Sequence, residues 1–164
     1  MAIAEKTLPS PRLSQVLVAK TFTLLSADAD KRTVIQQLAE ALVKTKRVTS
    51  EQSLVVLDEA MKREQVGSTG IGHGIAIPHC RSSLVKDILC SYGHCEAGLD
   101  FDSLDGEPVH SVFLLVTPPD LKAQHLQLMK NFASQIRKEH FCEFLRQVSS
   151  GQSLLDLLIE FENR

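Results

Sequence analysis

An unbroken run of apolar residues constrains the fold of this chain more than any other feature of its sequence. Ser111–Val116 carries five apolar side chains in succession, and Pro118 and Pro119 follow it closely. Successive side chains of a strand point to opposite faces, so a strand without polar alternation is buried on both faces. A proline pair ends such a segment. The run therefore predicts a central strand that other elements cover on both sides.

Helices are predicted on either side of this run. Residues 31–46 show apolar positions at helical spacing, with Asp28 or Asp30 available as the N-cap. The capping-box pattern Thr49-x-x-Gln52 starts a second amphipathic helix that should end near Arg63. After the proline pair, three more helices are expected: one capped by Asp120 with Leu126, Met129, Ala133 and Ile136 on its inward stripe, then Glu139–Val148 and Gln152–Phe161.

Shorter segments complete the predicted sheet. They are an edge strand over Thr21–Leu25, a buried strand over Ile75–Ile77, and a strand that starts at Ile88 and returns through a turn at Asp105-Gly106. Strands interleaved with helices predict an α/β fold, with a mixed parallel and antiparallel sheet and helices packed on both faces. We expect a flexible leader over residues 1–12, a short helix from Leu13, and a single domain over residues 13–164.

Composition excludes several classes of function. The chain has 164 residues, a formal net charge of −2, no Trp and a single Tyr, so neither a basic surface nor base-stacking aromatics favour nucleic acid as a partner. No apolar stretch is as long as the hydrophobic core of a signal peptide or as a membrane-spanning helix. The four cysteines lack the paired spacing of zinc sites. These features predict a cytoplasmic protein with free thiols that does not insert into a membrane.

A glycine-rich stretch leads into the strongest candidate for chemistry, His79. Four glycines lie between positions 67 and 74, and Ile75-Ala76-Ile77-Pro78 follows them. Pro78 restricts the backbone on either side of it, so the imidazole of His79 should leave the strand in a fixed direction. Backbone amides of a glycine-rich loop can surround an anion, which makes Gly70, Gly72 and Gly74 candidate phosphate-binding positions.

The segment Ser68-Thr69-Gly70-Ile71-Gly72-x-Gly74-Ile75-Ala76-Ile77-Pro78-His79 resembles the active-site signature of a known family. That family comprises the enzyme IIA domains of the bacterial phosphoenolpyruvate-dependent phosphotransferase system, in the mannitol/fructose and nitrogen-regulatory class. Arg63-Glu64, Leu114-Leu115-Val116 and His125-Leu126 also match its layout, so the resemblance extends from about Leu13 to the C-terminus. The family most often has glycine at the position of Cys80. This difference affects the expected geometry of the turn, but not the choice of His79 as the nucleophile.

The resemblance implies roles for two histidines and no cofactor. His79 would accept a phosphoryl group from a histidine-containing phosphocarrier protein, and His125 would donate a hydrogen bond to the phosphoryl oxygens. By pattern alone His125 lies on the inward side of its helix, where a histidine is more often a core residue. Arg63 could contribute positive charge to the same oxygens, or could simply be a cation at a helix C-terminus.

Other readings remain open at this stage. Cys80 could be the nucleophile of a cysteine hydrolase, and His73, His79 and His94 could in principle hold a metal, although their spacing matches no common ligand pattern. His94, His110 and His140 are otherwise read as structural or surface residues.

Four functions follow from these readings. The first is a phosphoryl carrier of the nitrogen-regulatory branch that acts on regulatory target proteins. The others are the enzyme IIA component of a sugar transporter, a module that binds a phosphometabolite without covalent modification, and the cysteine hydrolase.

Overall fold

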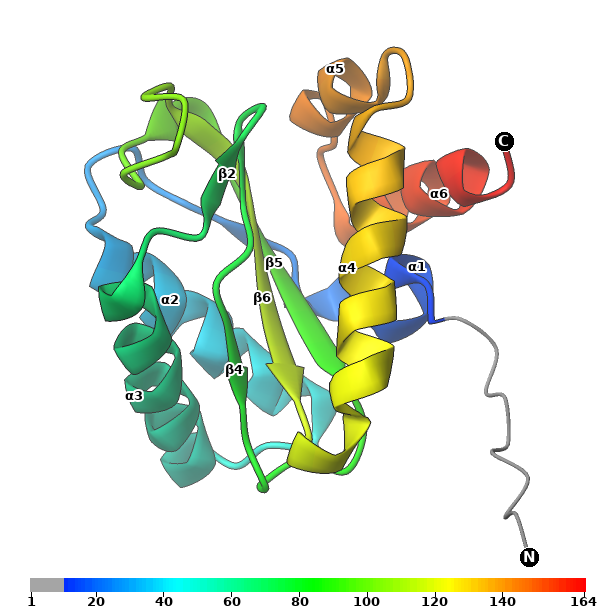
Figure 1. Cartoon of the computed structure of the whole chain (residues 1–164). Helices are drawn as coiled ribbons and strands as arrows, with labels where there is room; N and C mark the ends of the chain where they lie inside the picture. The colour runs from blue at the N-terminus through cyan, green and yellow to red at the C-terminus, as the bar shows by residue number, and fades with distance from the viewer. Residues whose placement is uncertain (1–10) are drawn as a thin grey trace, which may run out of the picture.

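The computed structural model describes residues 11–164 and is built around one six-stranded sheet (Figure 1). The strands lie in the order β1-β5-β6-β3-β2, and β4 also pairs with β6. β5 and β6 are antiparallel, as are β2 and β3, whereas β1 is parallel to β5 and both β3 and β4 are parallel to β6. The strands span Thr23–Leu24, Gly70–Gly72, Ile75–Ala76, His79–Arg81, Leu89–Leu99 and Val109–Thr117, for β1 to β6 respectively. The predicted mixed sheet is confirmed.

β6 is the central strand, and all nine of its residues are buried. β3 and β4 pair one after the other along the same edge of β6, with Ile75 opposite Ser111 and His79 opposite Leu115. The interruption between them has a chemical cause, because Pro78 has no N–H to donate to a ladder. Its carbonyl still accepts from the Leu115 N–H at 3.0 Å, so the chain stays against β6 on both sides of the break.

Two long helices cover one face of the sheet. α2 (Lys31–Ala41) is capped by the Asp30 carboxylate, which accepts from the Thr33 N–H, and a 3₁₀ turn, η2 (Leu42–Thr45), prolongs it. α3 (Ser50–Val66) starts with the predicted capping box and ends three residues later than expected. Their apolar sides pack on the sheet in a core of 21 buried residues that includes Leu38, Val56 and Val112.

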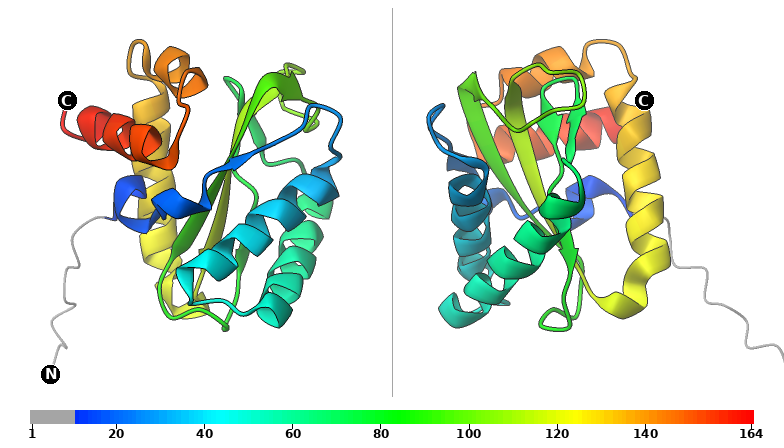
Figure 2. Two further views of the ribbon diagram at one scale, coloured as in Figure 1. Left: turned by 180° about the vertical axis from the view of Figure 1, so that it is seen from behind. Right: turned by 60° about the vertical axis from the view of Figure 1, so that its left-hand side comes forward.

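The remaining helices cover the opposite face, as both views of Figure 2 show. They are α1 (Leu13–Val16), α4 (Lys122–Ile136), α5 (Phe141–Arg146) and α6 (Gly151–Glu162), with short 3₁₀ turns at Ala19–Thr21 (η1) and Pro119–Leu121 (η3). A second core lies beneath them, and a series of aromatic edge contacts runs through it from Phe113 to Phe132, Phe141 and Phe161. The helices on both faces confirm the predicted α/β class.

One prediction about α4 is wrong, and a second is confirmed only in part. Asp120 does not cap it, because residues 119–121 form the η3 turn and Leu121, which makes no side-chain cap, precedes the helix. The inward stripe is right only in part: Met129 and Ile136 pack against the core, whereas Leu126 is 52% exposed and Ala133 is exposed. The buried residues of the helix are Leu128, Phe132 and Gln135. Helical periodicity shows that one side is apolar, but the direction from which the sheet approaches decides which residues of a broad stripe are covered.

The predicted flexible leader lies almost entirely outside the described residues, which begin at Pro11, and α1 starts at Leu13 as expected. Within residues 11–164, no helix is both long enough and apolar enough to cross a membrane.

Candidate functional site

His79 is the first residue of β4, and its side chain faces α4. The alternation of the strand establishes this direction, because Cys80 and its partner Val116 belong to the core beneath α2 and α3. Leu115, which pairs with His79, belongs to the core on the other face. Side chains two residues apart on a strand share a face, so Arg81 lies on the side of His79. A new strand therefore begins at His79, whereas the sequence predicts that His79 follows the end of a strand.

The imidazole of His79 is held in one tautomer by the backbone just before it. Its Nδ1 lies 2.8 Å from the carbonyl oxygen of Ile77. A carbonyl can only accept, so Nδ1 must carry the proton and Nε2 keeps its lone pair. Burial lowers the pKa of His79, and the positive charge of Arg63 lowers it further. A neutral ring with Nε2 available is the form that can act as a nucleophile.

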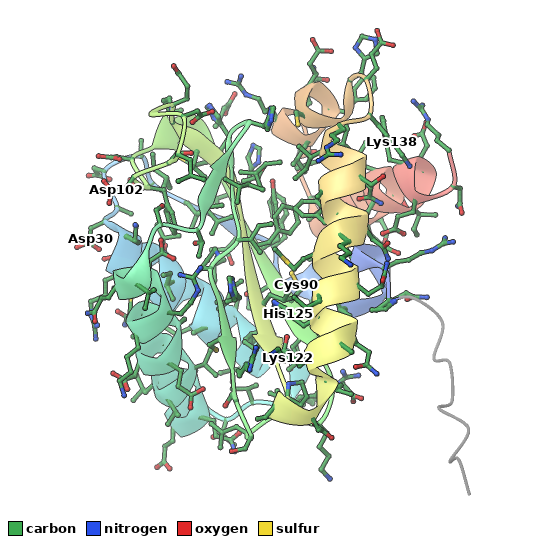
Figure 3. All side chains as sticks on the ribbon, viewed as in Figure 1. Asp30, Cys90, Asp102, Lys122, His125 and Lys138 are labelled. Atoms are coloured by element: carbon green, nitrogen blue, oxygen red, sulfur yellow. The ribbon has the colours of Figure 1, made fainter. Side chains whose placement is uncertain are left out.

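His125 approaches the same place from the first turns of α4 (Figure 3). The centroids of the His125 and His79 rings lie 5.3 Å apart, with an angle of 47° between the ring planes. Nδ1 of His125 lies 2.9 Å from the hydroxyl of Thr117, the last residue of β6. When that hydroxyl donates to Nδ1, Nε2 carries the remaining proton and can donate it. Burial, followed by the proximity of His79, lowers the pKa of His125 to about 4.

Arg81 is a neighbour of both rings that the sequence analysis missed. Its positive charge lowers the pKa of His79 and also that of His125. The side chain is exposed, and it pairs in register with Thr117, the residue that contacts His125. The i, i+2 spacing from His79 is the signal that would place Arg81 on the same face, but the sequence predicts that the strand ends at Pro78.

Arg63 lies in the last turn of α3, where its Nη1 donates to the Gly67 carbonyl at 2.9 Å. This contact matches the helix C-terminal role that the sequence left open. Its charge nevertheless reaches His79, whose pKa it lowers more than Arg81 does. The other N–H donors of the Arg63 guanidinium could bind an anion.

The structure does not gather the three glycines around His79. Gly70 donates its N–H to the Ser68 hydroxyl, at 3.1 Å. Gly72 approaches the Asp105 carboxylate, and the Gly74 carbonyl accepts from the N–H groups of His110 and Ser111. Ser111 and Leu115, the positions on β6 opposite Ile75 and His79, are about 13 Å apart at roughly 3.3 Å per residue. The expected amide cradle is therefore corrected, because these glycines shape the β2–β3 turn against the β5–β6 connection.

Two alternative chemistries find no support in the geometry. Cys80 is buried, and desolvation raises the pKa of its thiol to about 12, so little thiolate exists near neutral pH. His73 lies in the β2–β3 turn, and His94 contacts the Tyr92 hydroxyl at 3.0 Å on β5. Among the described residues, no group of three or more His, Cys, Asp or Glu side chains is arranged to hold a metal ion.

A known protein family matches most of this chain. Residues 16–161 match the family model described as phosphoenolpyruvate-dependent sugar phosphotransferase system, EIIA 2. The chain belongs to this EIIA family. His79, Arg81 and His125 lie within the matched residues, and the resemblance noted in the sequence is confirmed.

EIIA relatives of two kinds resemble the chain. A nitrogen regulatory protein from Pseudomonas aeruginosa is 30% identical over 152 residues, which cover 93% of this chain and 97% of the relative. A fructose-specific EIIABC component from Bacillus subtilis is 27% identical over 147 residues, but these cover only 23% of that longer protein and 90% of this chain.

Solved EIIA structures share the fold. The crystal structure of the nitrogen regulatory protein IIA-Ntr from Neisseria meningitidis superimposes with a TM-score of 0.78 at 27% identity, covering 88% of this chain and 97% of the other. IIA mannitol from Escherichia coli has a TM-score of 0.69 at 22% identity, covering 85% and 96% respectively, and at this identity shows the fold alone. Nitrogen-regulatory relatives thus support that branch, while sugar-specific relatives share the architecture.

Proposed function

We propose that this EIIA-type protein is a phosphoryl carrier whose Nε2 of His79 receives a phosphoryl group from a histidine-containing phosphocarrier protein. The observation that carries the proposal is the contact between His79 Nδ1 and the Ile77 carbonyl, which leaves Nε2 as the nucleophilic atom. The new N–P bond forms as the N–P bond of the donor histidine breaks, and the donor ring keeps the electron pair. The Nδ1 proton stays on His79, where the carbonyl offsets the positive charge of the phosphorylated ring.

The surrounding groups suit a transferred dianion. His125 presents a ring at 5.3 Å that can donate through Nε2, and Arg81 and Arg63 add positive charge. Phosphoryl transfer asks mainly for positioning and for charge stabilisation of this kind. No cofactor takes part in this proposal.

Two classes of downstream partner are consistent with the family. We favour regulatory target proteins, because nitrogen regulatory relatives align with the chain over nearly their whole length. The second candidate is a sugar-transporter subunit. The fructose-specific relative favours it, as does a solved complex of Escherichia coli IIA mannitol with phosphorylated IIB mannitol. The four free cysteines suit a reducing compartment, and we propose that the exchange takes place in the cytoplasm.

The test is to incubate the purified chain with phosphoenolpyruvate, the first enzyme of the system and its phosphocarrier. Intact mass should rise by one phosphoryl group, the adduct should be labile in acid, and His79→Ala should abolish it. His125→Ala should still form the adduct, but more slowly. An adduct that persists in His79→Ala would contradict the proposal. Binding of a phosphometabolite without a mass increase would favour the non-covalent module.

A second step separates the two downstream roles. Phosphorylated protein is mixed with a fructose-type IIB domain, and transfer of the label is followed over time. Rapid transfer would favour the transporter role, whereas retention of the label on His79 favours the regulatory one.

A further inference from the structure

A buried ion pair lies behind the loop that leads to His79. The Glu64 side chain is only 2% exposed, and Nζ of Lys31 approaches its Oε1 at 3.0 Å. Lys31 begins α2 and Glu64 lies in the last turn of α3. Each charge thus sits at the end of its helix that the macrodipole disfavours. Local helix preferences do not explain this placement, so its cause must lie in what the pair contacts.

The pair holds Thr69, at the start of the glycine-rich turn. Glu64 Oε1 accepts from the Thr69 N–H at 3.0 Å, and Oε2 accepts from the Thr69 hydroxyl at 2.6 Å. Thr69 is itself 4% exposed, so both bonds form away from solvent. A buried carboxylate with two donors and a cation fixes the position of the residue it holds.

Thr69 in turn holds the residue that selects the tautomer of His79. The Thr69 carbonyl accepts from the Ile77 N–H at 3.0 Å, and the Ile77 carbonyl accepts from His79 Nδ1 at 2.8 Å. Pro78 lies between Ile77 and His79 and limits the backbone rotation that could uncouple them. Every contact from Lys31 to the imidazole is therefore a hydrogen bond or an ion pair of ordinary length.

We propose that Glu64 and Thr69 are positioning residues: they hold the Ile77 carbonyl so that His79 keeps its proton on Nδ1 and presents Nε2. This inference rests on the proposed phosphoryl-carrier function for its effect on rate, but not for its effect on the tautomer. Neither side chain touches the transferred group. Misplacement of a reacting group by about 1 Å can cost about 100-fold in rate, so modest loosening of this chain of contacts should be measurable.

The key variant is Thr69→Val, which removes the hydroxyl but keeps the shape and the backbone N–H. The populations of the Nδ1–H and Nε2–H tautomers are read from nitrogen-15 NMR of His79 in the unphosphorylated protein. We expect the Nδ1–H fraction to fall and the phosphorylation rate per folded molecule to drop about tenfold. Thr69→Ser restores the hydroxyl and should return both values close to wild type. Should Thr69→Val fail to fold, Thr69→Ala removes the same hydroxyl without placing a methyl group against the carboxylate.

Asp102→Asn is the matched control, because Asp102 contacts the same Lys31 ammonium at 3.3 Å but is 79% exposed, and no hydrogen bond joins it to Thr69. It should change neither readout. A Thr69→Val protein that is less stable yet keeps the wild-type tautomer and rate would overturn the inference, since the contacts would then serve only the fold. If wild type takes up no phosphoryl group, the proposed function fails, while the tautomer measurement still decides whether Thr69 positions His79.

Discussion

At the scale of single residues, the site depends on two neutral imidazoles that face each other between β4 and α4. Burial lowers the pKa of both rings, so each is uncharged near neutral pH. Their Nδ1 atoms are occupied by neighbours on the protein, the Ile77 carbonyl for His79 and the Thr117 hydroxyl for His125. Both Nε2 atoms are thereby left available for the phosphoryl transfer that we propose.

The two arginines near the site should be distinguishable by their effect on the histidines. Arg63 acts on His79, whereas Arg81 acts on both His79 and His125. Removing a positive charge makes protonation easier, so Arg63→Ala should raise the pKa of His79 and Arg81→Ala should raise the pKa of both rings. NMR titration of the imidazole signals measures this directly.

Each arginine variant should also slow phosphorylation by about 5- to 30-fold, the equivalent of about 1–2 kcal/mol of charge-assisted stabilisation. Arg164→Ala is the control, because that residue pairs with Glu160 on α6. If Arg81→Ala left the pKa of both rings unchanged, Arg81 would have no part in the site.

At the scale of elements, the position of α4 depends on how the helices behind it pack. α6 supports the core that α4 shares, and it begins at Gly151, directly against the η1 turn. A Cβ at Gly151 would lie 1.9 Å from the Ala19 carbonyl oxygen, a backbone atom that cannot turn aside. Close approach, not a positive φ, is the reason for glycine there.

Gly151→Ala should therefore destabilise the protein by about 2–3 kcal/mol, despite the better helix propensity of alanine. Gly67→Ala is the matched control, since its extended backbone suits any residue and no atom lies within 4 Å of the added Cβ. Urea denaturation should show no more than about 0.5 kcal/mol of change for Gly67→Ala. Equal stability of the two variants would mean that η1 can move away from α6.

At the scale of the whole molecule, the buried histidines make stability depend on pH. The pKa of His125 is about 4 in the folded protein, against about 6.5 when unfolded. Between these values the unfolded chain binds more protons, so the free energy of unfolding should fall as the pH drops from about 6.5 toward 4. His79 acts in the same direction because its pKa is also lowered.

His125→Asn should flatten this dependence, because it removes one of the groups that must stay neutral in the folded state. The measurement is the free energy of urea unfolding of wild type and variant between pH 7.5 and about 4.5. Parallel curves for the two proteins would show that the pKa of His125 is not lowered by folding.

The sequence by itself determined the parts of this protein that depend on local pattern. The apolar run at Ser111–Val116 predicted the buried central strand, the capping box at Thr49 predicted where α3 begins, and the motif ending in His79 predicted the family. Each of these signals is carried by neighbouring residues, whose backbone preferences and side-chain alternation need no distant partner to be read.

Only the tertiary structure decided which residues distant in the sequence lie in contact. It directed the glycines of the β2–β3 turn to the β5–β6 connection instead of to His79, and it placed Arg81 beside His125. It also left Leu126 52% exposed, although the pattern places Leu126 on the same inward side as His125, which contacts β6 through Thr117. Contacts of this kind depend on strand register and on the direction from which a helix packs. Both are set by long-range packing, which cannot be read from any single stretch of sequence.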